Sequence, residues 1–160
     1  MKYTDTKIVF REFPDEVTLA INIAQCPFRC EGCHTPKLRD DIGTDLTLDE
    51  LERIIRQHLN IITCVGFMGG DADLKYIEYL VSGMKSRLGP KKRIKFGMYS
   101  GNDSLYNVLA KCRSLDYIKI GHYDAELGPI DKEGSNQRMY RLNNDGYYDN
   151  ITAQMRSKIF

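Results

Sequence analysis

Residues 16–34 read EVTLAINIAQCPFRCEGCH, an apolar run that leads directly into a loop with three cysteines. Val, Leu and Ile recur in residues 16–23, together with a Thr, and this composition predicts a strand. The loop that follows carries Cys26, Cys30 and Cys33 within eight residues. A strand therefore delivers three thiols to one loop.

Further along the chain, short apolar runs alternate with stretches of helical spacing. The predicted strands are residues 64–68, 94–99, 117–120 and 137–142, and the predicted helices are residues 47–59, 74–88 and 104–112. Thr47 is expected to cap the first helix, because Glu50 follows three residues later. Residues 147–160 are expected to add a last core strand or helix.

Alternation of strands and helices favours an α/β fold with a mostly parallel sheet and crossover helices. Four or five such units are too few for a complete eight-stranded barrel, so residues 1–160 are expected to form a single domain, either an open, partial βα barrel or an open α/β sheet. Ligand sites in both architectures lie at the carboxyl ends of the strands. The unusual loops of this sequence follow predicted strands.

The charge and the amino terminus limit the class of protein. With 23 Lys and Arg against 22 Asp and Glu, no electrostatic attraction to nucleic acid or to a membrane surface is expected. Residues 1–7 lack the pattern of a secretory signal, and no stretch approaches the roughly 20 apolar residues of a membrane span. We therefore expect a cytoplasmic, reduced protein, with Cys64 and Cys112 as buried, inert thiols.

Three other interpretations of the cysteine loop remain open. A structural zinc site needs four ligands, and His34 adjoins Cys33 too closely to supply the fourth easily. Residues 30–34 match the attachment signature of c-type haem, although such attachment usually accompanies export. A redox dithiol of Cys30 and Cys33 would leave Cys26 without a role.

A 4Fe-4S cluster makes the best use of three thiols. Cys26, Cys30 and Cys33 would each bind one iron and leave the fourth iron without a protein ligand. That iron is open to a small chelating molecule, and S-adenosylmethionine can chelate it through its amino and carboxylate groups.

With its surroundings, the motif resembles the radical S-adenosylmethionine superfamily, and within it the activating proteins of anaerobic, class III ribonucleotide reductases. Gly32 stands where the superfamily usually has an aromatic residue, and the ending Gly32-Cys33-His34 is typical of these activases. The resemblance implies a partial βα barrel of the radical-SAM type, and it places Gly32, Cys33 and His34 at the cofactor.

The resemblance extends to three later segments. Gly69, Gly70 and Asp71 resemble the motif that holds the methionine amino group, with Ala72 where relatives usually have proline. The same residues also fit a plain turn.

Ser100 follows the predicted strand 94–99, where a similar segment contacts the cofactor in the family; a turn with Ser104 as helix cap fits equally. Residues 127–130 and 135–138 closely resemble the carboxyl-terminal signature of the activases. Arg138 is a candidate to bind the methionine carboxylate, with a solvated arginine as the alternative.

The function implied by the resemblance is reductive cleavage of S-adenosylmethionine at the cluster to a 5'-deoxyadenosyl radical. The radical would generate a glycyl radical on the large subunit of the anaerobic ribonucleotide reductase, with a flavodoxin-type or similar reductant as electron donor. No side-chain acid or base is required. The rivals are an activase of another glycyl-radical enzyme, a non-enzymatic iron-sulfur electron carrier and a zinc-stabilised interaction domain.

Overall fold

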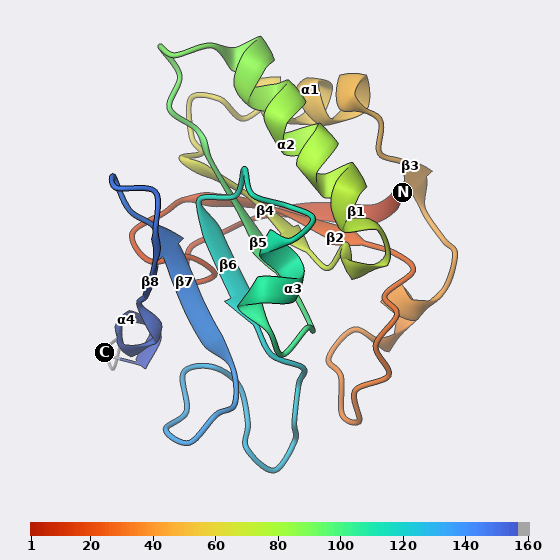
Figure 1. Cartoon of the computed structure of the whole chain (residues 1–160). Helices are drawn as coiled ribbons and strands as arrows, with labels where there is room; N and C mark the ends of the chain where they lie inside the picture. Colours follow the sequence, from red (N-terminus) through yellow and green to blue (C-terminus); the bar gives the residue numbers. More distant parts are fainter. Residues whose placement is uncertain (157–160) are drawn as a thin grey trace.

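The centre of the molecule is a row of four parallel strands at positions that the sequence predicts. In the computed structural model, which describes residues 1–156, they lie side by side in chain order (Figure 1). They are β2 (Thr18–Ile23), β4 (Cys64–Met68), β5 (Lys95–Tyr99) and β6 (Tyr117–Ile120). Because the strands are parallel, the loops that follow them gather at one end of the sheet.

Antiparallel strands flank this centre on both sides. β1 (Lys2–Val9) pairs with β2 and β3 (Thr44–Asp45) pairs with β1, whereas β7 (Arg138–Leu142) pairs with β6 and β8 (Tyr148–Asn150) pairs with β7. The eight strands of residues 1–156 form an open, mixed sheet, where the sequence predicted a mostly parallel one. β7 is antiparallel to β6 because the loop between them starts and ends at the same end of the sheet, with no crossover helix.

The two longest helices follow the predictions closely. α1 (Leu48–Arg56) begins after Thr47, whose Oγ1 accepts a hydrogen bond from the Glu50 backbone N–H at 3.1 Å, and the predicted cap is confirmed. The helix ends three residues before Leu59. α2 (Leu74–Leu88) has the predicted bounds.

The remaining helices are short. α3 (Leu105–Leu109) is shorter than predicted, and the Ser104 hydroxyl makes no capping hydrogen bond to it. Single turns form η1 (Pro36–Arg39) and η2 (Asp71–Asp73), and α4 (Thr152–Arg156) follows β8. Thus the predicted tail element is a strand and a helix, and residues 157–160 of that prediction lie outside the described residues. None of the helices within residues 1–156 has the length and apolarity to cross a membrane.

The two faces of the sheet have different covers. α1 and α2 lie together on one face (Figure 1). The residues of the central strands that pack on this side are Leu19, Ile21, Ile23, Val65, Phe67, Phe96, Met98, Ile118 and Ile120. Side chains alternate along a strand, so the intervening residues point to the opposite, inner face.

The inner face is covered by the segment between β1 and β2. Phe13 is fully buried there; its ring stacks on Tyr117 with 5.2 Å between centroids and meets Tyr99 edge-on at 5.6 Å. Gly66 and Gly97 are register partners beneath the ring, and a Cβ on Gly66 would lie 2.8 Å from it. Only glycines leave room for Phe13 at these two positions.

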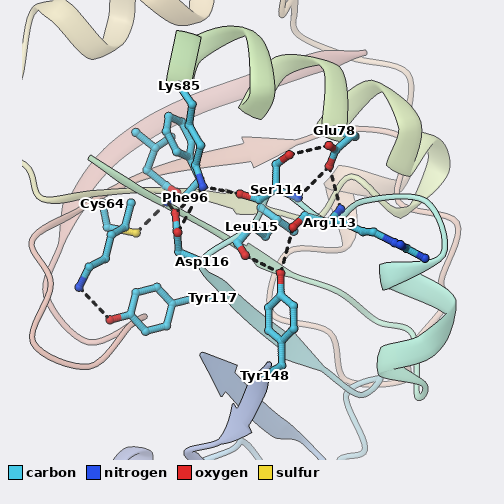
Figure 2. Close-up of polar contacts among 12 residues, drawn as sticks. Cys64, Glu78, Lys85, Phe96, Arg113, Ser114, Leu115, Asp116, Tyr117 and Tyr148 are labelled. Atoms are coloured by element: carbon cyan, nitrogen blue, oxygen red, sulfur yellow. Dashed lines mark hydrogen bonds and ion pairs between the residues drawn. The ribbon is translucent and has the colours of Figure 1, made fainter. Parts of the chain in front are cut away.

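Polar contacts hold α2 to the chain just before β6, at the end of the sheet away from the cysteine loop. Figure 2 shows Glu78 of α2 accepting hydrogen bonds from the backbone N–H groups of Arg113 and Ser114 at 2.8 and 2.9 Å and from the Ser114 hydroxyl at 2.5 Å. Two turns further along α2, Lys85 pairs with Asp116 at 3.1 Å. Burial alone would raise the pKa of Glu78, but these hydrogen bonds outweigh it and lower the pKa.

Candidate metal and cofactor site

The cysteine loop leaves β2 and is held at its base by backbone hydrogen bonds. The N–H of Cys26 donates to Leu38 O at 2.8 Å, and the N–H of Cys33 donates to Cys30 O at 3.3 Å. Arg39 Nη2 also donates to Cys30 O at 2.7 Å. Arg39 therefore helps to shape the loop.

The three thiols of this loop line one cavity of about 190 Å³. Cys26, Cys30 and Cys33 are each partly buried, and burial is the main cause that raises the pKa of Cys26. No three His, Cys, Asp or Glu side chains within residues 1–156 are placed to hold a single metal ion. A four-iron cluster binds each thiolate at a different iron, so its ligands stand apart from one another. Three soft donors around one cavity fit such a cluster.

The loop after β4 reaches the same cavity. Gly69 and Asp71 line it together with Ser100, so the structure brings these predicted residues to the three cysteines. Asp71 Oδ1 accepts a hydrogen bond from the Ser100 hydroxyl at 2.5 Å, and Oδ2 accepts one from the Gly101 N–H at 3.0 Å. Burial outweighs these hydrogen bonds and raises the pKa of Asp71. The β4 and β5 loops are thus locked together through one carboxylate.

Two of the glycines predicted at the cofactor have a conformational role in the backbone. Gly32 and Gly70 have φ values of +73° and +107°, in the region that favours glycine. A Cβ on Gly70 would lie 2.8 Å from Ile77 Cδ1, so this glycine lets the loop pack closely on α2. Neither glycine is among the residues that line the thiol cavity.

Two side chains predicted at the cofactor lie outside the thiol cavity. His34 is exposed and tilts against Tyr123 with 5.2 Å between ring centroids. Arg138 Nη1 donates to the backbone carbonyls of Ser135 and Gln137. Its guanidinium orders the loop before β7, as Asn136 also does by donating to His122 O at 3.0 Å.

The remaining cysteines are as predicted. Cys64 and Cys112 are fully buried in the two apolar clusters of the core. Burial is the main cause that raises the pKa of both thiols. Protonated, enclosed thiols are poor metal ligands and poor nucleophiles.

Lys119 lines the thiol cavity from β6, although no motif in the sequence marks it as a site residue. Its Nζ lies 4.4 Å from the centre of the Tyr99 ring. Tyr99 is the residue of β5 that pairs with Lys119 in the sheet. Burial lowers the pKa of Lys119 to about 8, with an opposing contribution from Cys30. The one available signal was a lysine within the apolar run 117–120.

A larger cavity of about 530 Å³ adjoins the first and shares Cys33, Tyr99 and Lys119 with it. Its other walls come from far-apart segments of the chain, among them Arg11 before β2 and Arg156 at the end of α4. The cysteine loop therefore faces a second space on the inner side of the sheet.

The sequence model of one protein family, the 4Fe-4S single cluster domain, matches residues 17–142. This range begins just before β2 and ends with β7, so it includes the cysteine loop and the four central strands. No curated protein and no solved structure matches the chain.

Proposed function

The chain belongs to the 4Fe-4S single cluster domain family, and on that premise we propose that it is a radical S-adenosylmethionine enzyme that activates a glycyl-radical partner. In this proposal Cys26, Cys30 and Cys33 hold the cluster, and the open sheet is a partial βα barrel of the radical-SAM type.

One observation carries the proposal: the three cysteines share a cavity with Gly69, Asp71 and Ser100. A cluster with three protein ligands leaves room for a chelating cofactor, and an acidic side chain beside it suits the ammonium of an amino acid. Thiols and carboxylate come from two different loops at one end of the sheet. A protein that only carries electrons has no need of this second loop.

When bound, the cluster would supply one electron to S-adenosylmethionine, whose C–S bond breaks to give methionine and a 5'-deoxyadenosyl radical that takes a hydrogen atom from a glycine. The protein's residues bind and orient. Asp71 would accept hydrogen bonds from the methionine ammonium, and the Ser100 hydroxyl keeps the Asp71 carboxylate in place. Arg138 remains a candidate to bind the methionine carboxylate, but only through guanidinium nitrogens other than Nη1, which donates to backbone carbonyls.

The cavity of about 530 Å³ is the proposed entry for the partner's glycine, because it opens beside Cys33 on the inner face. The proposed partner is the large subunit of an anaerobic ribonucleotide reductase, with a flavodoxin-type or similar protein as reductant. An activase of another glycyl-radical enzyme would use the same geometry.

The test is anaerobic reconstitution with iron and sulfide, followed by dithionite and S-adenosylmethionine. We expect about four irons per chain, a paramagnetic signal on reduction, and formation of 5'-deoxyadenosine and methionine. Cys30→Ala should lose most of both the iron and the products, whereas Cys112→Ala, a matched change in the core, should keep them.

The outcomes separate the possible functions. Iron without products would leave a non-enzymatic electron carrier, and the absence of iron with bound zinc would leave a zinc-stabilised domain. Product formation by Cys30→Ala at the wild-type rate would show that the ligand assignment is wrong.

A further inference from the structure

Lys119 occupies an unusual place for a lysine. It lies on β6, a central strand with neighbours on both sides, and its side chain is on the inner face between the two cavities. The residues before and after it, Ile118 and Ile120, pack into the core on the helix face. The pairing of Tyr99 with Lys119 places the ammonium over the aromatic ring.

Among residues 1–156, this ammonium has no carboxylate partner. None of the ion pairs formed within residues 1–156 includes Lys119. By contrast, Lys85 of α2 and Lys95 of β5 are paired with Asp116 and Glu16. A partly buried charge without a partner among residues 1–156 is costly, and a contact with one ring face offsets only part of the cost.

A group that can balance this charge is the cluster. Lys119 and Cys30 line the same cavity and interact electrostatically. A 4Fe-4S cluster with three thiolate ligands carries a net negative charge and becomes more negative when it is reduced. A nearby fixed cation therefore favours the reduced form, because net charge and surroundings set the potential of such clusters.

We propose that Lys119 is the counter-cation of the iron-sulfur cluster and raises its reduction potential. Tyr99 holds the ammonium in position through its ring face, and partial burial on the inner face weakens the screening of its charge by water. The proposal rests on the proposed ligation of the cluster by Cys30, and it does not depend on cleavage of S-adenosylmethionine.

The experiment compares midpoint potentials of reconstituted proteins by anaerobic redox titration monitored by paramagnetic resonance. Lys119→Met keeps the length of the stem and removes the charge. We expect the equilibrium constant for one-electron reduction to fall about tenfold, which corresponds to about 59 mV for a one-electron couple. Lys119→Arg, which keeps the charge, should retain most of the wild-type potential.

Lys92→Met is the matched control, because Lys92 is exposed and lies before β5, at the end of the strand away from the cavity. It should leave the potential unchanged. Equal potentials in Lys119→Met and Lys92→Met would overturn the proposal. Loss of the cluster from Lys119→Met alone would support a need for the charge, whereas its loss from Lys119→Arg as well would mean that shape matters and would also overturn it.

The two proposals can fail separately. If the wild-type protein forms no cluster, the proposed cysteine ligation is wrong and both proposals fail. A wild-type cluster that is reduced but does not cleave S-adenosylmethionine removes the proposed enzyme and leaves the role of Lys119 to be decided by the potentials.

Discussion

Glu78 is the acidic side chain that holds α2 to the chain just before β6, and its charge should matter for folding. Its pKa is lowered in the folded protein, so the folded state binds fewer protons than the unfolded state as the pH falls. The stability that Glu78 contributes is present above its ordinary pKa of 4.5 and is lost as the pH drops through the lower folded value. We expect Glu78→Gln to be less stable at pH 7, and to lose less stability than wild type between pH 5 and the acid limit.

The measurement for Glu78 is urea unfolding at several pH values, with Glu133→Gln as control. Glu133 is exposed in the loop before β7. Its variant should follow the wild-type curve throughout. If Glu78→Gln also follows that curve, the hydrogen bonds of Glu78 contribute nothing to folding.

At this scale the sequence predicts residues whose signal is local. Three cysteines within eight residues point to a metal site wherever the fold places them, and Asp71 follows a recognisable glycine pair. Lys119 could not be found in this way. Its importance depends on the pairing of β5 with β6 and on the position of the cysteine loop that follows β2, which are contacts between distant parts of the chain.

Among the elements, the start of α1 depends on one hydroxyl. Thr47→Ala removes the acceptor of the Glu50 N–H and should cost about 1 kcal/mol of unfolding free energy. Ser104→Ala is the matched control, because Ser104 occupies the same position before α3 without a capping hydrogen bond. Chemical denaturation should show a clear loss for the first variant and little for the second. Equal losses would mean that the hydroxyl of Thr47 is not what starts α1.

Elements with strong apolar patterns were predicted well, and elements at the sheet edges were not. β4 and α2 have the predicted bounds because each carries an uninterrupted or periodic apolar signal. β1 was missed because Thr4, Asp5 and Thr6 make it polar, and it is only partly buried in the sheet. Its strand conformation comes from pairing with β2, which the local sequence does not report.

For the whole molecule, loading with iron and sulfide should tie the cysteine loop to the rest of the fold. Within residues 27–35 the backbone makes few hydrogen bonds, and Arg29 is exposed. We expect trypsin to cut after Arg29 at least several-fold more slowly in the loaded protein than after chelation of the iron, because ligand bonds fix a loop that is otherwise free to open.

Mass spectrometry of the tryptic fragments over time gives both rates. Cleavage at residues 91–93, an exposed segment between α2 and β5, serves as the internal reference and should be equal in the two forms. Equal rates of cleavage after Arg29 in the two forms would show that the cysteine loop does not bind the metal.

Phe13 limits how another molecule can bind to the inner face of the sheet. Its ring already fills the space over Gly66 and Gly97, so the middle of the inner face is occupied by the protein's own side chain. Open room is left at the rim, beside Cys33 and Tyr99. In the proposed function, a partner protein would therefore present the tip of a projecting loop and would not lay an extended strand across the sheet. The reach of that tip would decide whether its glycine meets the proposed radical.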